Sequence, residues 1–306
     1  MPIPPEARKL LLEKGISAIS DPPGQIRVYV ETEADIEKLP SFIAGFSVEP
    51  IISGRFFALQ FRTGKWRPAP GGVSIGHYKI TAGTLSSRVY DKTTKTRLIL
   101  SNNHVLAWSN QGIIGDPIYQ PGVWDGGTEL DTIAKLERFV EIRPPPEENL
   151  VDCAVAKPLN DADLSDEILD IGTVTDLENA LVGMWVGKSG RTSGYTEATV
   201  IDINAIVKVY GYPLLEYAIF KDQIVTNLLG KPGDSGSLVV NPATKKAVGL
   251  LFAGSDTNTI LNKITNVSNL LNIDFEPVPP VPPVKANIPG ILIPLMIGGF
   301  ITSYKK

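Results

Sequence analysis

The sequence is poor in cysteine and histidine. Its 306 residues include one cysteine, Cys153, and two histidines, His77 and His104. A single cysteine excludes an internal disulfide and any metal site built on several cysteines. We therefore predict neither a metal nor a cofactor, and any histidine chemistry must use one of the two histidines.

The net charge of the chain is also small. The 33 acidic and 29 basic residues leave a formal net charge of −4. Such a chain has no basic surplus to attract phosphate backbones, so we expect no nucleic acid partner. Residues 1–15 mix acidic and basic side chains and do not have the pattern of a signal peptide. With the single cysteine, this predicts a cytoplasmic protein.

The 43% of hydrophobic residues suffice for a globular core, and their pattern predicts a mainly β protein with three regions. Residues 1–60 contain an alternating strand at 25–31 and a helical stretch after Thr32, which predicts a small α/β appendage. Residues 61–272 contain short strands separated by Gly, Asp, Asn and Pro, which is typical of a sandwich or barrel. Residues 273–306 form a proline-rich linker and an apolar tail.

Within the central region we expect one strand at 80–90 and further strands at 132–142, 151–156, 198–209, 217–226, 237–240 and 247–252. Residues 161–181 have the most helical or loop-like pattern, and we expect them to bridge two β modules, with a division near 160–180.

The tetrapeptide Gly233-Asp234-Ser235-Gly236 predicts a nucleophile loop. Glycines on both sides let the backbone bend tightly and expose the serine hydroxyl. The N–H groups of Gly233 and Ser235 can then converge as an oxyanion hole. The alternative is a polar turn before a strand.

A serine hydroxyl needs a base, and the base needs a carboxylate that orients it. His104 follows an apolar strand in Ser101-Asn102-Asn103-His104, whereas His77 has no flanking signature and we expect it to be structural. Asp152 stands at the head of an apolar run, where an acid is costly to bury unless it is paired. Alone, His104 could be a turn histidine and Asp152 a turn cap.

Together, the three residues stand in the order His, Asp, Ser, and with their flanking motifs they resemble the chymotrypsin-like serine proteases. The resemblance covers about residues 61–272. It implies a double β-barrel in which one barrel supplies His104 and Asp152 and the other supplies Ser235. A closer resemblance, to bacterial trypsin-like proteins related to the plant narrow-leaf protease, rests on four stretches: residues 67–77, the histidine stretch at 101–106, and residues 115–117 and 188–194.

One feature departs from the family pattern. In activated trypsin-type enzymes, a newly cut N-terminus pairs with the aspartate that precedes the nucleophilic serine, which corresponds to Asp234 here. No matching cleavage sequence precedes His104, so Asp234 needs another partner, or the loop stays unformed until something binds. The resemblance also places the base of the primary pocket at Leu229 and its entrance at Phe252, Ala253 and Gly254. Without a carboxylate at the base, this pocket predicts cleavage after hydrophobic residues.

The sequence therefore predicts a serine endopeptidase that acts on proteins or peptides through His104, Asp152 and Ser235. The alternative is a binding or scaffolding protein with a protease fold and little or regulated turnover. The apolar tail at 291–301 is too short for a membrane helix, since 11 residues span only about 17 Å. We expect it to dock on another subunit of a homo-oligomer or on a partner protein; a core extension and a membrane contact are the alternatives.

Overall fold

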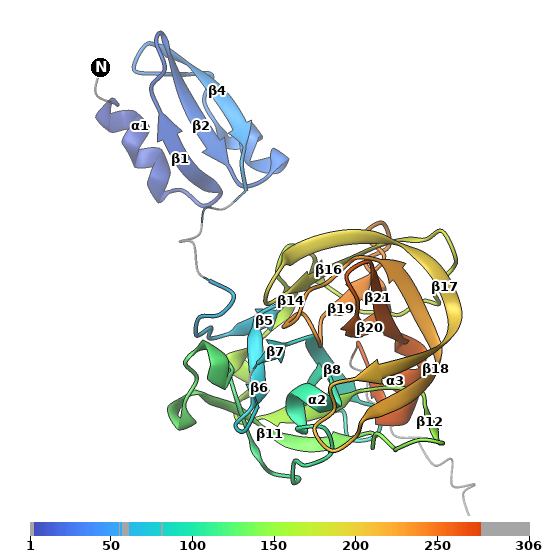
Figure 1. Cartoon of the computed structure of the whole chain (residues 1–306). Helices are drawn as coiled ribbons and strands as arrows, with labels where there is room; N and C mark the ends of the chain where they lie inside the picture. The colour runs from blue at the N-terminus through green and yellow to red at the C-terminus, as the bar shows by residue number, and fades with distance from the viewer. Residues whose placement is uncertain (1–2, 55, 57–60, 81, 277–306) are drawn as a thin grey trace, which may run out of the picture.

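The computed structural model describes residues 3–54, 56, 61–80 and 82–276 (Figure 1). The predicted apolar tail lies outside the described residues, and the expectations for it stay predictions.

The N-terminal region forms a four-stranded sheet in the order β1-β2-β4-β3, with β2 and β4 parallel. Strand β2 alternates because Ile26, Val28 and Val30 face a small core while the residues between them are half-buried. The elements are α1 (Pro5–Lys9), η1 (Leu10–Leu12), β1 (Ile16–Ser20), β2 (Gln25–Val30), η2 (Glu33–Lys38), β3 (Phe42–Ile43) and β4 (Phe46–Ile52). The predicted helical stretch is the 3₁₀ helix η2, and Thr32 and Asp35 form a capping box at its start.

An eight-stranded sheet in the order β22-β8-β9-β13-β11-β10-β6-β7 forms the first barrel. Its core contains Ile75, Ile99 and Ile133, which are all fully buried. The elements before the bridging segment are β5 (Ala69–Gly71), β6 (Ser74–His77), β7 (Gly83–Thr84), β8 (Ser87–Asp91), β9 (Arg97–Ser101), α2 (Asn103–Leu106), β10 (Pro117–Tyr119), η3 (Val123–Asp125), η4 (Glu129–Asp131), β11 (Thr132–Phe139), β12 (Glu148–Asn149) and β13 (Ala154–Pro158).

A seven-stranded sheet in the order β12-β18-β17-β16-β19-β20-β21, closed by pairing of β18 with β21, forms the second barrel. The long antiparallel strands β17 and β18 form a hairpin that extends beyond the barrel (Figure 1). The remaining elements are η5 (Asp161–Asp163), β14 (Leu164–Ile168), β15 (Gly172–Thr173), β16 (Trp185–Gly190), β17 (Gly194–Tyr210), β18 (Tyr217–Asn227), β19 (Leu238–Val240), β20 (Ala247–Gly254), β21 (Asn258–Lys263), α3 (Ile264–Leu271) and β22 (Ile273–Asp274).

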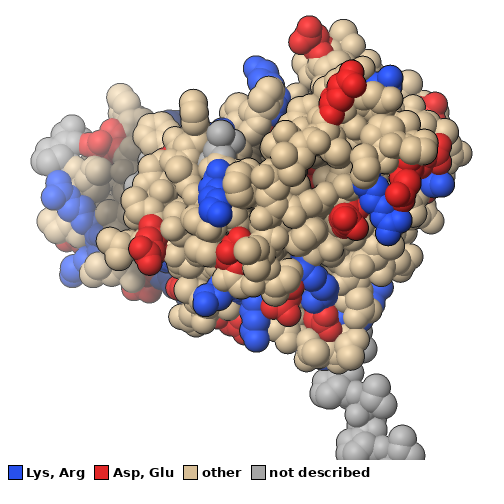
Figure 2. All heavy atoms as spheres, turned by 60° about the horizontal axis from the view of Figure 1, so that its bottom comes forward, with Lys and Arg blue, Asp and Glu red and all other residues tan. Residues whose placement is uncertain are grey.

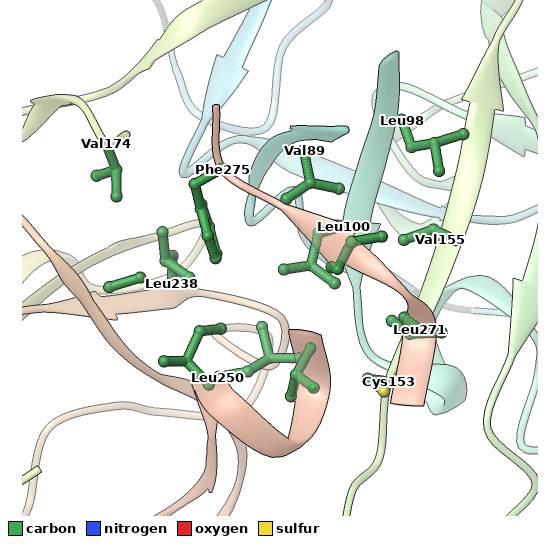
Figure 3. Packing of buried hydrophobic residues seen from close by; sticks show 14 of the residues in the cluster. Val89, Leu98, Leu100, Cys153, Val155, Val174, Leu238, Leu250, Leu271 and Phe275 are labelled. Atoms are coloured by element: carbon green, nitrogen blue, oxygen red, sulfur yellow. The ribbon is translucent and has the colours of Figure 1, made fainter. Parts of the chain in front are cut away.

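The two barrels share a hydrophobic cluster (Figure 3). Leu100 on β9 and Val155 on β13 come from the first barrel, whereas Leu238 on β19 and Leu250 on β20 come from the second. Phe275 is fully buried in the same cluster. Burial of a full-sized apolar side chain contributes about 1.5–3 kcal/mol, so this seam fixes the position of one barrel against the other.

Three predicted boundaries differ from the structure. The segment 161–181, expected to be helical or loop-like, contains strands β14 and β15, because Leu164 packs in the core of the first barrel and Ile168 packs in the cluster that both barrels share. The expected strand at 80–90 is interrupted between β7 and β8. The packed region continues beyond residue 272, since β22 pairs with β8.

Lys and Arg are interspersed with Asp and Glu over the face drawn in Figure 2, with no large area of one sign there. Among the described residues, no helix is long and apolar enough to cross a membrane.

Candidate active site

His104 and Asp152 are held together by two hydrogen bonds. His104 lies in the short helix α2, and its backbone N–H donates to Asp152 Oδ1 at 3.1 Å. Its ring Nδ1 lies 2.6 Å from Asp152 Oδ2. Because a carboxylate only accepts, Nδ1 carries the proton, and the lone pair of a neutral ring is on Nε2. The carboxylate is fully buried, while 27% of the imidazole surface is exposed. This is the arrangement that a general base needs.

Asp152 is surrounded by further polar partners. The Tyr212 hydroxyl donates to Oδ2 at 2.8 Å. The side-chain amides of Asn102 and Asn262 both donate to the Asp152 carbonyl, at 2.7 and 3.1 Å. These bonds fix the backbone and the side chain of the buried acid at once.

Ser235 lies in a tight loop against the His104 segment. Gly236 has φ +95°, and a Cβ there would lie 2.1 Å from Ser101 Oγ and 2.3 Å from the Thr84 carbonyl, so only glycine fits. The Thr84 N–H donates to the Ser235 carbonyl at 2.8 Å. Within the described part of the chain, no hydrogen bond joins Ser235 Oγ to His104 Nε2. Catalytic hydrogen bonds are often long without substrate.

The N–H groups of Gly233 and Ser235 donate no hydrogen bond to any described residue. The Pro232 carbonyl accepts from Thr192 Oγ1 at 2.9 Å, and the Asp234 carbonyl accepts from the Ser237 N–H at 3.0 Å. In a trans peptide the N–H points away from the carbonyl of the same unit. Both N–H groups are therefore directed away from these partners, and they are available for an oxyanion.

Asp234 is paired with Lys188, a residue that the sequence analysis did not identify as functional. Lys188 Nζ lies 3.1 Å from Asp234 Oδ2, and both side chains are fully buried. The carboxylate also accepts from the N–H groups of Thr192, Ser193 and Lys231. Burial works to raise the pKa of Asp234, but the charge of Lys188 and the hydrogen bonds from Ser193 and Lys231 outweigh it and hold that pKa below its usual value.

The signal for Lys188 was present in residues 188–194. A lysine between small residues in an apolar strand has no exposed face for its ammonium group, so it needs a buried acid. Gly190 supplies the room, because a Cβ there would lie 2.5 Å from Asp234 Oδ1.

A pocket of about 310 Å³ opens beside Ser235. The predicted entrance residues Ala253 and Gly254 line it, and Leu251 and Thr259 add to its wall. The structure does not bring Leu229 or Phe252 to this lining. Leu229 is 2% exposed and packs inside the second barrel. Phe252 alternates with Leu251 along β20, so its ring turns away and packs on Phe220 at 4.8 Å.

A second hollow, of about 230 Å³, also borders the Ser235 loop. Pro232 borders both hollows, and Gly233, Ala82, Trp124 and Arg191 complete the second one. The Trp124 side chain is 74% exposed. A peptide bound at this loop could therefore contact both hollows.

His77 belongs to a separate pair. Its Nε2 lies 2.9 Å from Asp116 Oδ2, and its Nδ1 accepts from the Lys79 N–H. The ring is fully buried and stacks on Trp108 with centroids 6.1 Å apart. Burial lowers the pKa of His77 and outweighs the opposing effect of Asp116. Among the described residues, no three His, Cys, Asp or Glu side chains are grouped to hold a metal ion.

Comparisons with known proteins agree with this architecture. Nocardiopsis protease matches with a TM-score of 0.50 at 19% sequence identity, over 68% of this chain and 98% of that one. Thermobifida fusca protease A matches with the same TM-score and coverage at 15% identity. A glutamic acid-specific serine protease matches with a TM-score of 0.50 at 18% identity, over 67% of this chain and 99% of that one. The chain therefore has the fold of the chymotrypsin-like serine proteases, as its motifs predicted.

Sequence comparison adds a short match. Streptogrisin-A of Streptomyces griseus is 38% identical over 82 residues, which are 27% of this chain and a quarter (25%) of that protein. No family model matches the chain. The closer resemblance to bacterial relatives of the plant narrow-leaf protease stays a prediction.

Proposed function

We propose that the chain is a serine endopeptidase that hydrolyses peptide bonds through an acyl-enzyme on Ser235. The observation that carries the proposal is the loop geometry, in which Gly233 and Ser235 keep unengaged N–H groups in a loop that packs against the segment of the hydrogen-bonded His104–Asp152 pair.

The chemistry follows from these groups. His104 Nε2 takes the Ser235 hydroxyl proton as Oγ attacks the peptide carbonyl carbon, whose π electrons move to its oxygen. The N–H groups of Gly233 and Ser235 stabilise that oxyanion, and Asp152 stabilises the imidazolium. The imidazolium then protonates the leaving amine, and water, activated by the same histidine, releases the acid from Ser235.

The pocket beside Ser235 supports a preference for hydrophobic residues before the cleaved bond. Leu251 and Ala253 give it apolar walls, whereas its charged residues, Lys231 and Asp256, are exposed. Burial of a Leu or Phe side chain contributes up to about 3 kcal/mol. Thr259 Oγ1 already accepts from two backbone N–H groups, so it offers little to a basic side chain.

Two measurements test the proposal. A fluorophosphonate probe should label the wild type and not Ser235→Ala, since only an activated serine is rapidly phosphonylated. Wild-type protein that resists the probe indicates the scaffold alternative. Peptides that differ only in the residue before the cleaved bond should rank Leu and Phe above Lys and Glu by at least about tenfold in kcat/KM. Dominant cleavage after Lys or Glu would remove the hydrophobic preference and leave the mechanism in place.

A further inference from the structure

Tyr212 joins the two barrels at the catalytic acid. It lies in the turn between β17 and β18 of the second barrel, yet its hydroxyl donates at 2.8 Å to Asp152, which precedes β13 of the first barrel. The side chain is 7% exposed and belongs to a cluster with Phe220 and Phe252. Its ring meets the His104 ring edge-on, at 6.4 Å between centroids.

The hairpin that carries Tyr212 is fastened to the segment that carries Asp152. Strand β12 pairs with β18 in parallel, with Asn149 opposite Phe220. The Asn149 amide donates to the Ile219 carbonyl at 3.1 Å, and the Gln223 amide donates to the Leu150 carbonyl at 2.9 Å. Strand pairing and these two side-chain bonds therefore hold the hairpin of Tyr212 against the segment of Asp152.

We propose that Tyr212 is a positioning residue of the triad, whose hydroxyl holds the Asp152 carboxylate in the orientation that receives the Nδ1 proton of His104. This rests on the proposed function. The carboxylate is fully buried, and the side-chain donors to its oxygens are the His104 ring and Tyr212. A buried carboxylate without enough donors is unstable as an anion, and it is free to turn away from the imidazole.

The hydroxyl is a donor throughout the working pH range. Burial, and then the charge of Asp152, raise the pKa of Tyr212 well above its usual value. The hydrogen bond from Tyr212 therefore supports Asp152 without a proton exchange of its own.

The test removes only the hydroxyl. Tyr212→Phe keeps the ring that packs on Phe220. A hydrogen bond to a charged group contributes enough to lower kcat about 10- to 100-fold when it is lost, with KM within about twofold. Tyr210→Phe is the matched control, since its ring lies on the same hairpin, is 64% exposed and packs on Tyr217. It should leave both constants unchanged.

Measuring Tyr212→Phe in an enzyme that already carries Asp152→Asn separates positioning from a general loss of packing. If Tyr212 acts through the carboxylate, then Tyr212→Phe should change kcat by less than about twofold once Asp152→Asn is present. Equal effects in both backgrounds contradict the proposal. So does a Tyr212→Phe enzyme with wild-type kcat.

Proton NMR gives a readout that needs no turnover. The His104 Nδ1–H bonded to Asp152 should give a low-field resonance, which moves in Tyr212→Phe and stays in Tyr210→Phe. An unmoved resonance overturns the inference even if the protein cleaves nothing. If the resonance moves in Tyr212→Phe but the wild type does not react with the fluorophosphonate, the inference on positioning stands and the proposed function is rejected.

Discussion

The chain contains two histidine–aspartate pairs with similar N···O distances and different surroundings. His104 and Asp152 lie 2.6 Å apart, and His77 and Asp116 lie 2.9 Å apart. The first imidazole is partly exposed beside the nucleophile loop. The second is sealed under Trp108, and both of its ring nitrogens are engaged.

The difference shows that an Asp–His hydrogen bond alone does not define a catalytic base. A base also needs an unengaged nitrogen, access to solvent and substrate, and a leaving group that accepts the proton it has taken up. In the first pair the carboxylate is the buried member. In the second the imidazole is fully buried while 18% of the carboxylate surface is exposed. Access therefore separates the two pairs more clearly than distance does.

The largest expected effect on kcat comes from replacing each histidine in turn with alanine. His104→Ala should lower kcat about a million-fold, as should Ser235→Ala, because the triad acts as a unit. His77→Ala should leave the chemical step nearly intact in protein that circular dichroism shows to be folded. Loss of activity in folded His77→Ala, with activity kept in His104→Ala, would reverse the assignment.

The aspartates give the next test. Asp152→Asn should lower kcat about ten-thousand-fold, because an amide can donate to Nδ1 and favour the wrong tautomer. Asp116→Asn makes the same change in the other pair and should leave kcat within about threefold, since no reacting group touches it. Similar losses in both variants would mean that the pairs are not functionally distinct.

Another buried acid, Asp234, extends the comparison because its partner is a lysine. Lys188→Met should lower kcat about 100- to 1000-fold, since the loop that presents the Gly233 and Ser235 N–H groups loses its anchor. It should also lower the free energy of unfolding by about 3–5 kcal/mol, because Asp234 is left buried and unpaired.

The control for Lys188 is Lys246→Met, which breaks an exposed ion pair with Asp176. That change should cost less than about 1 kcal/mol in urea denaturation and should not affect kcat. Full activity of Lys188→Met would show that the loop keeps its shape without the ion pair.

The sequence predicted the β architecture well because its signals are local. Alternation and turn residues located β17, β18 and β20 close to their observed bounds, and the glycines of residues 233–236 predicted a tight bend. The proximity of His104 and Asp152, expected from motif order, is present in the structure. Their catalytic roles remain to be tested by the variants above.

The remaining features depend on contacts between distant segments. Lys188 and Asp234 are 46 positions apart, and Tyr212 and Asp152 are 60 apart, so no local pattern links either pair. The resemblance places Leu229 at the base of the pocket, but the loop register and the alternation of side chains decide which residues line a pocket. Strands β14 and β15 are short and paired at an edge, and they carry weak periodicity.

The smallest expected effect returns to His77 and concerns stability against pH. Its folded-state pKa is lowered by burial, so between its ordinary pKa near 6.5 and that lower value the unfolded chain binds more protons. The contribution of His77 to stability is therefore complete above about pH 6.5 and is lost as pH falls through the folded-state pKa.

Urea denaturation at pH 7.5 and 5.5 should thus show wild type losing more stability on acidification than His77→Gln, which cannot take up the proton. The difference between the two proteins cannot exceed about 1.4 kcal/mol per pH unit, the slope for one proton. Groups that do not contact His77 are the same in both proteins, so their contributions cancel in the difference. If wild type instead gains stability relative to His77→Gln on acidification, then His77 is protonated in the fold and the effect of Asp116 on its pKa outweighs that of burial.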